Sequence, residues 1–228
     1  MLPLSVNNGD LIPMFMDNVS NSPVFLNSRV LNSLMIFGEY EIGQRYLLNI
    51  IDTLAHTNAE LHIIDLSHEL GLNSDFEHGM FVYDADDINL LLANAGMRED
   101  VNIPRVYITY ALSELQSKLD ALRPGVFDSI DKILEDVYNN GGRNNQFWLS
   151  VDASHSNFLN DRSNSLNYSR CGRAVVLSPR YISIGEAMNF GRNVPCLLDI
   201  DYNDCDLPAG QAWLCLRNSF RRVVLPME

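Results

Sequence analysis

The chain alternates short apolar runs with longer segments of helical periodicity, and this alternation constrains its fold more than any other feature. The first clear unit is the run Ser33 to Phe37, which is followed by Gly38 and then by apolar residues at helical spacing from Ile42 to Leu54. Further β-prone runs cover residues 61–65, 81–83, 105–110, 147–151 and 174–177. Because strands that alternate with helices form a mainly parallel sheet with helices on both faces, the sequence predicts an α/β fold.

Both ends of the chain depart from this alternation. Residues 1–32 hold short apolar runs broken by Asn, Gly, Asp and Pro, which indicates an irregular β entry with a hairpin turn at Asn8-Gly9. Near the other end, the β-prone runs 212–216 and 221–225 flank a few polar residues and predict a C-terminal β-hairpin. With 228 residues, no internal repeat and no low-complexity linker, we expect a single domain over 1–228.

The intervening helices have weaker signals. Asp84 to Asp87 can cap a helix that carries apolar side chains from Ile88 onward. A broken helical stretch is predicted over 112–138, with an interruption at Pro124-Gly125, and we expect a turn at 139–143.

Charge excludes one class of partner. The chain has 16 Lys and Arg residues against 29 Asp and Glu residues, a net charge of −13. Such a field repels a phosphate backbone, so nucleic acid is not an expected partner. No apolar stretch approaches the ~18–20 residues of a membrane span. The cysteines, Cys171, Cys196, Cys205 and Cys215, form no C-x-x-C pair, and the N-terminus has no secretory signal, so we expect free thiols in a reducing cytosol.

The segment Gly38 to Arg45 has the glycine spacing of the phosphate-binding motif G-x-x-x-x-G-K-S/T between a strand and a helix. After Gly43, however, Gln44 and Arg45 occupy the positions where Lys would reach the phosphates and a hydroxyl would hold Mg²⁺. Glu39 and Glu41 add like charges, each costing about 4 kcal/mol at ~4 Å and an effective dielectric of ~20. A triphosphate should be bound weakly or rejected, and an ordinary βα turn stays open as an alternative.

The order of the segments resembles a FtsK/SpoIIIE-type ATPase domain. The matching segments are the β entry, a decayed Walker A over 31–45, the strand that ends in Asp65-Leu66-Ser67, the strand 105–110 before Ser113-Glu114-Leu115, and the strand 147–151. The closing segment Asp206 to Leu214, together with 221–226, is similar to the terminal Leu-Pro-x-Gly-x-(Ala/Gly) hairpin of the tandem ATPases of type VII secretion, the EssC/EccC proteins. The resemblance covers nearly the whole chain and implies a RecA-like P-loop NTPase fold.

Within that resemblance the Walker B position has also changed. At the end of the strand 105–110 stand Thr109 and Tyr110, where the family has an Asp that holds the Mg²⁺ shell. Asp65 lies on a different strand, and we expect it to be a helix cap or a solvated strand end rather than a metal ligand. Asp152 follows the strand 147–151 and is a candidate remnant of a polar sensor. The sequence therefore predicts no catalytic residue, no metal ligand, at most weak binding of ATP and Mg²⁺, and a domain that is not an enzyme.

Other chemistry-bearing residues have simpler explanations. His62 and His68 lie close to Asp65 in sequence, but strand geometry separates them, so solvated or capping roles are expected. No G-x-S-x-G elbow supports a hydrolase. Arginines near the strand 174–177 fit either charge pairing or a contact with a neighbour's nucleotide, and several aromatic residues fit either a peptide-binding patch or the core. These residues are Arg170, Arg173 and Arg180, and Phe158, Tyr168 and Trp213.

The resemblance implies the degenerate C-terminal ATPase domain of a type VII secretion motor, on the cytoplasmic side of a cell-membrane protein. Its expected partners are secreted substrates, such as small helical Trp-x-Gly proteins, the adjacent ATPase domains, and further copies in a homo-hexamer of the full-length protein. The alternative is an active or weakly ATP-binding FtsK-like translocase domain. Within the vacated motif we expect Glu41 to pair with Arg45, because the two residues have i,i+4 spacing.

Overall fold

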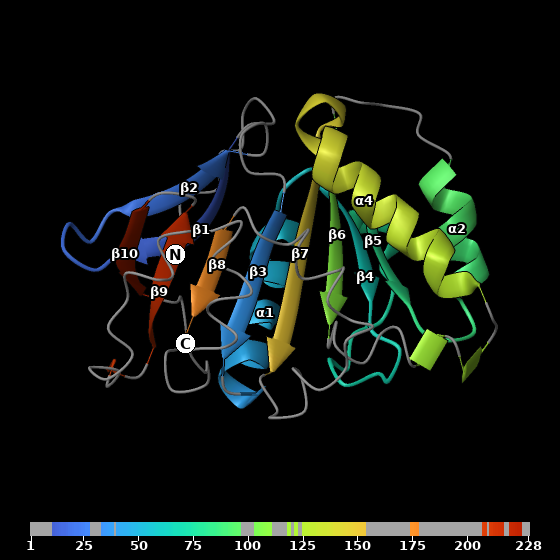
Figure 1. The fold of residues 1–228 in the computed structure, drawn as a ribbon, viewed down its shortest axis with the longest axis horizontal. Coiled ribbons are helices and arrows are strands. Elements are labelled where there is room, and N and C mark those ends of the chain that lie inside the picture. Colours follow the sequence, from blue (N-terminus) through green and yellow to red (C-terminus); the bar gives the residue numbers. More distant parts are fainter. Residues whose placement is uncertain are drawn as a thin grey trace.

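The computed structural model describes residues 11–27, 33–38, 40–96, 103–110, 118–119, 121–122, 125–153, 174–177, 207–208, 210–216 and 219–224. Within these residues ten strands form one sheet, in the order β2-β1-β10-β9-β8-β3-β7-β6-β4-β5 (Figure 1).

One side of this sheet is parallel. Its strands are β3 (Ser33–Gly38), β4 (Glu60–Ile64), β5 (Met80–Tyr83), β6 (Arg105–Tyr110), β7 (Gln146–Ala153) and β8 (Ala174–Leu177). The strand β3, which precedes the others in the chain, lies between β7 and β8. The predicted α/β architecture and its RecA-like arrangement are confirmed.

The other side of the sheet is antiparallel and joins the two ends of the chain. It contains β1 (Leu11–Asp17), β2 (Pro23–Asn27), β9 (Gln211–Leu216) and β10 (Ser219–Val224). The pairing of β9 with β10 confirms the C-terminal hairpin, and β10 also pairs with β1. The expected turn at Asn8-Gly9 lies outside the described residues.

A second hairpin, which the sequence did not predict, joins β1 to β2. The carboxylate of Asp17 holds its turn, because Oδ1 accepts hydrogen bonds from the backbone amides of Val19 and Ser20 at 3.0 and 2.8 Å. These bonds also lower the pKa of Asp17.

Helices cover both faces of the parallel strands. The helix α1 (Tyr40–Ala55) lies behind β3 and β7 in Figure 1, and α4 (Val126–Asn144) lies in front, next to α2 (Ile88–Gly96). In the turn just before α2, Oδ1 of Asp84 accepts from the amides of Asp86 and Asp87 at 2.7 and 3.0 Å, so Asp84 caps this turn and not the helix itself.

The helix α4 corrects one expectation. The expected turn at 139–143 is helical, and α4 ends only at Asn144, after which the backbone of Asn145 is left-handed with φ of 51°. Glycines in a helix cost about 1 kcal/mol each relative to Ala. The buried apolar stripe of α4, which consists of Val126, Ile130, Leu134 and Val137, outweighs that preference.

The two faces of the sheet differ in chemistry. The strand side chains on the α1 face are aliphatic or aromatic: Leu34, Ile36, Leu61, Ile63, Val106, Ile108, Phe147 and Leu149. The alternating positions on the α4 face include the buried polar side chains Ser33, His62, Arg105, Thr109, Gln146 and Ser150, together with Tyr107 and Trp148. The α1 face is therefore an ordinary apolar core, whereas the α4 face depends on buried polar contacts.

The edge strand β5 is covered by the segment before it. The hydroxyl of Ser74 accepts from the amide of Val82 at 2.9 Å and donates to its carbonyl at 3.3 Å. Asp75 and Met80 exchange two backbone hydrogen bonds of 2.8 Å. This cover blocks pairing with another strand.

We predict that Ile108→Ala lowers the free energy of unfolding by about 2–5 kcal/mol, because the side chain is fully buried in the apolar core. Urea denaturation followed by circular dichroism measures the change. Val19→Ala is the control, since this side chain is 93% exposed, and its effect should stay within about 0.5 kcal/mol. Equal effects of the two changes would contradict the assignment of the core.

Candidate functional site

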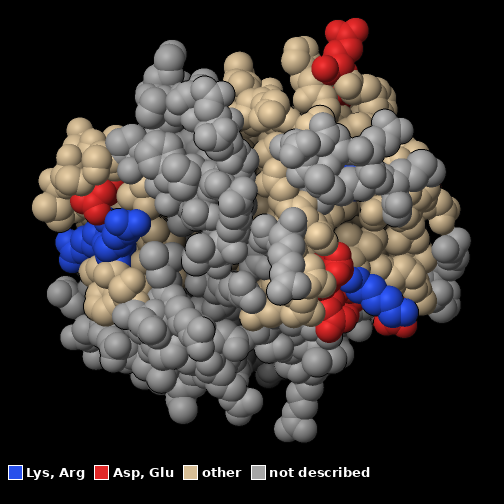
Figure 2. All heavy atoms as spheres, turned by 90° about the horizontal axis from the view of Figure 1, so that it is seen from above, with Lys and Arg blue, Asp and Glu red and all other residues tan. Residues whose placement is uncertain are grey.

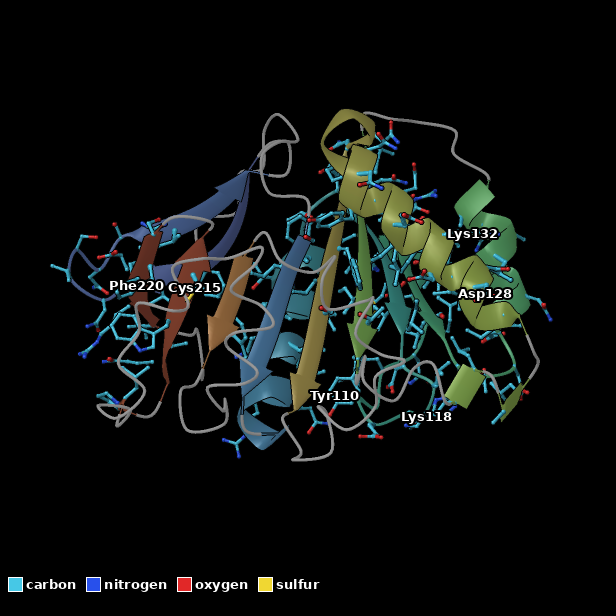
Figure 3. The ribbon with its side chains drawn as sticks, viewed as in Figure 1. Tyr110, Lys118, Asp128, Lys132, Cys215 and Phe220 are labelled. Atoms are coloured by element: carbon cyan, nitrogen blue, oxygen red, sulfur yellow. The ribbon has the colours of Figure 1, made fainter. Side chains whose placement is uncertain are left out.

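The carboxyl ends of β3, β6 and β7 meet at one edge of the sheet, because these strands are parallel neighbours. Open α/β sheets bind their ligands at this edge. It lies at the bottom of Figure 1, and Figure 3 labels Tyr110 and Lys118 there. The residues that follow these strands therefore form the candidate site.

The connection from β3 to α1 is shorter than the phosphate-binding motif predicts. Gly38 is the last residue of β3, and α1 already begins at Tyr40. Gly43 is buried within the first turns of α1, and Gln44 and Arg45 are helical as well. Only the first four amides of a helix lack an intrahelical partner, so the amides of residues 40–43 are the ones that α1 can direct at an anion.

Gln44 is engaged with the protein itself. Its Nε2 atom donates a hydrogen bond of 2.6 Å to the backbone carbonyl of Glu69, in the segment that follows β4. Arg45 is exposed on the surface of α1. The side chain of Glu41 lies outside the described side chains, so the expected pair with Arg45 stays a prediction.

The segment from Asp65 to Leu70, which we call the β4 turn, is fixed by its own carboxylate. Asp65 is buried, and its two oxygens accept from the amides of Glu69 and Leu70 at 3.1 and 2.8 Å. Asp65 is therefore a cap, one of the two roles expected for it, although it caps a turn and not a helix.

Lys118 reaches the same turn from the segment that follows β6. Its ammonium group donates to Oγ of Ser67 at 2.5 Å and lies 3.8 Å from a carboxylate oxygen of Glu69. Lys118 and Glu69 were not expected from the sequence to belong to this site. No local motif marks them, because their contacts join segments up to 51 residues apart.

The Walker B position is also used structurally. Thr109 is fully buried on the α4 face, and its Oγ1 accepts a hydrogen bond of 3.0 Å from Nε1 of Trp148 on β7. Tyr110, the last residue of β6, is 7% exposed. Asp152 is paired in register with Phe37, and its side chain lies outside the described side chains.

The histidines do not form a metal centre in the part of the chain that is described, where no cluster of three or more His, Cys, Asp or Glu side chains is present. His68 is exposed and lies 3.2 Å from the carboxylate of Asp84. The expected solvated or capping role of His62 is wrong. Its ring is fully buried between Phe81 and Tyr107, with centroids at 5.1 and 5.2 Å, because β4 is an interior strand of the sheet.

Among the remaining residues singled out from the sequence, Trp213 and Cys215 lie within the described part of the chain. Trp213 is half-buried on β9, where its ring contacts Phe220 at 5.3 Å and Arg222 at 5.1 Å (Figure 3 labels Phe220). Cys215 is a buried cysteine that forms no disulfide among the described residues. The other candidates, Arg170, Arg173, Arg180, Phe158, Tyr168, Cys171, Cys196 and Cys205, lie outside the described residues. In Figure 2 the visible Lys and Arg side chains lie beside Asp or Glu.

Comparisons with solved structures bear on this fold. The chain is similar to EccC of Thermomonospora curvata (ATPases 2 and 3, in complex with a signal sequence peptide), with 16% identity and a TM-score of 0.61. It is also similar to the cytoplasmic domain of the type VII secretion ATPase EccC from the same organism (14%, 0.62) and to EssC (ATPases 2 and 3) from Geobacillus thermodenitrificans (14%, 0.60). The matches cover 100%, 100% and 97% of this chain, but only 42%, 28% and 42% of those chains.

At these identities the likeness establishes the fold, which is that of the ATPase domains of EccC and EssC. The resemblance inferred from the sequence is confirmed at that level. No family model matches the chain, and no curated protein matches it either.

The comparisons correct one expectation from the sequence. The expectation that the domain is not an enzyme is wrong, because the similar structures are P-loop ATPases, a class of enzymes. Within the described residues, no helix has both the length and the apolar character needed to cross a bilayer.

We predict that Thr109→Asp does not create a magnesium site. The new carboxylate would lie under α4 beside Trp148, so it should lower the free energy of unfolding by at least ~2 kcal/mol. Urea denaturation measures the loss, and calorimetry with Mg²⁺ tests for binding. The control Thr109→Val keeps the shape and removes one hydrogen bond, at about 1–3 kcal/mol. A stable Thr109→Asp protein that binds Mg²⁺ would contradict this placement, because it would show that the side chain faces the candidate site at the carboxyl ends of the strands.

Proposed function

We propose that this chain is an ATPase-fold domain of a type VII protein-secretion motor, that it recognises export substrates and assembles with neighbouring ATPase domains, and that it binds ATP and Mg²⁺ at most weakly. The observation that carries this proposal is the contact of Gln44 with the carbonyl of Glu69. At the position where the motif needs a lysine aimed at phosphates, the side chain instead fastens α1 to the β4 turn.

Three further features support weak nucleotide binding. A neutral amide at position 44 adds no positive charge, and Thr109 has no carboxylate to hold the magnesium shell. The early start of α1 also shortens the connection that would wrap around the phosphates. Among the described residues, ATP would then gain from the amides at the start of α1 and from their share of the helix dipole.

Substrate recognition is supported by analogy. One structure with this fold is an EccC protein in complex with a signal sequence peptide, and another is the cytoplasmic domain of EccC. We infer that the present chain is likewise a single cytoplasmic domain of a cell-membrane protein. Its partners would be secreted helical proteins, the adjacent ATPase domains and further copies in a homo-hexamer, without nucleic acid.

The alternative is an active, or weakly ATP-binding, FtsK-like translocase domain. It is favoured by the names of the similar structures, which describe ATPases. The two candidates differ in how nucleotide binding depends on position 44 and on magnesium.

We predict that ATP binds with a Kd above about 1 mM, the upper end of common substrate constants. Because Gln44 contacts Glu69 and β6 ends without a carboxylate, Gln44→Ala and the removal of Mg²⁺ should each change this Kd less than twofold. Titration with a fluorescent ATP analogue measures both effects. Micromolar binding that requires Mg²⁺ and is lost in Gln44→Ala would favour the translocase.

The substrate arm needs a separate titration. The C-terminal segment of a small helical Trp-x-Gly export protein should bind with a micromolar Kd, about −8 kcal/mol. Because the chain carries −13, a segment with basic flanks should bind more weakly in high salt. A scrambled segment of the same composition is the control. If the segment binds only to the full-length motor, this domain serves assembly and the proposal of substrate recognition fails.

A further inference from the structure

Five side chains on the α4 face of the sheet form a closed ring of hydrogen bonds, which we call the β4 ring: Glu60, His62, Tyr83, Asn94 and Arg105. The ring joins β4, β5 and β6 to α2. Nδ2 of Asn94 donates to the hydroxyl of Tyr83 at 3.1 Å, and this hydroxyl lies 2.8 Å from Nδ1 of His62. Nε2 of His62 lies 2.8 Å from a carboxylate oxygen of Glu60.

Arg105 closes the ring. Its guanidinium donates to both oxygens of Glu60 at 3.0–3.1 Å, and Nη1 donates to the backbone carbonyl of Asn94 at 3.2 Å. The side chain of Arg105 is 5% exposed, and that of His62 is 0% exposed. The ring is therefore a largely buried polar circuit, in which the side chain of Glu60 is 27% exposed and Asn94 is the member that lies on a helix.

The donors and acceptors fix the protonation state of His62. Glu60 is ionised and can only accept, so Nε2 of His62 carries the proton. Nδ1 must then accept from the hydroxyl of Tyr83, which in turn accepts from Asn94. If His62 gained a second proton, Nδ1 would become a donor, and the buried hydroxyl hydrogen of Tyr83 would lose its acceptor.

The helix α2 has little else to hold it in place. It has nine residues, shorter than a helix that is stable alone, and among its described side chains only Ile88 and Leu91 are buried. Asn94 lies in the last turn, and it contributes both its side-chain amide and its backbone carbonyl to the ring. The end of α2 therefore depends on the ring.

The geometry points to a proton-sensitive latch: protonation of His62 opens the β4 ring and releases the C-terminal end of α2 from the sheet. This inference does not rest on the proposed function, because the ring contains none of the residues that form the candidate functional site. His62 is the proton-sensitive residue of this latch, because its imidazole is fully buried and hydrogen-bonded at both ring nitrogens.

Burial and the neighbouring charges determine how the latch responds to pH. Burial lowers the pKa of His62, and the positive charge of Arg105 lowers it further, although Glu60 opposes both. The guanidinium of Arg105 stays charged, and burial raises the pKa of Tyr83 to about 12, so Tyr83 stays neutral. Burial alone would raise the pKa of Glu60, but contacts with His62 and Arg105 lower it on balance.

The sign follows from linkage. A histidine whose pKa is depressed in the closed state favours that state above its ordinary pKa of about 6.5. The preference is lost as the pH falls below 6.5. The depressed pKa of Glu60 acts in the same direction, but at a lower pH. Another described histidine lies near α2: Nε2 of His68 is 3.2 Å from a carboxylate oxygen of Asp84, in the turn before the helix.

Hydrogen exchange of the backbone amides tests the latch. For the amides in the last turn of α2, the protection factor, corrected for intrinsic rates, should fall by up to about tenfold between pH 7.5 and 5.5, the limit for one such proton. Amides of β6 and β7 should change less than twofold. An equal fall in all three elements, or no fall in α2, would overturn the inference, because the ring would then be only a source of global stability.

Variants separate the latch from other titrations. His62→Gln keeps one donor for Glu60 and one acceptor for Tyr83, so it should retain the protection of α2 at pH 7.5 and lose its pH dependence. Tyr83→Phe cuts the link to Asn94 and should lower the protection of α2 at pH 7.5 to about the wild-type value at pH 5.5. It supplies a second test should His62→Gln fail to fold. The control His68→Gln should leave the fall intact, and a fall that vanishes there but persists in His62→Gln would overturn the assignment.

Discussion

The central strands are parallel, and this arrangement requires that both faces of the sheet be covered. The α1 face meets the requirement with aliphatic side chains, which need only shape and area. The α4 face meets it with polar groups that hydrogen-bond across strands, such as Thr109 with Trp148 and Glu60 with Arg105. A buried polar group is costly unless it is paired, so this face depends on these specific contacts between strands, and α2 is joined to them through Asn94.

The same need to pair buried polar groups explains the contacts that Gln44 and Thr109 make near the candidate site. In a P-loop ATPase, the residues after the first strand and at the end of the Walker B strand serve the ligand. Here Gln44 binds the carbonyl of Glu69 and Thr109 binds Trp148, so both positions serve the structure. The fold of EccC and EssC is kept, while the residues that would hold phosphate and metal have other partners.

Much of the fold could be predicted because each strand carries a local signal. The apolar runs marked the strands, and the closing Leu-Pro segment located the hairpin of β9 and β10. The environment of His62 could not be predicted, since a histidine between apolar neighbours has the same local pattern on an edge strand as on an interior one. Nor could the contact of Gln44 with Glu69, because it joins segments that only the sheet order brings together.

The pairing of β1 with β10 has a consequence for biosynthesis. Met16 and Asp17 are registered with Val224 and Val223, so the outer part of the sheet combines the two ends of the chain. At ribosomal speeds of about 5–20 residues per second, the first hairpin would wait roughly 10–40 s for its partner strand to be translated. During that interval one edge of β1 has unsatisfied amides and carbonyls. A chaperone that holds the nascent β1–β2 hairpin would then aid folding more than one that acts on the finished chain.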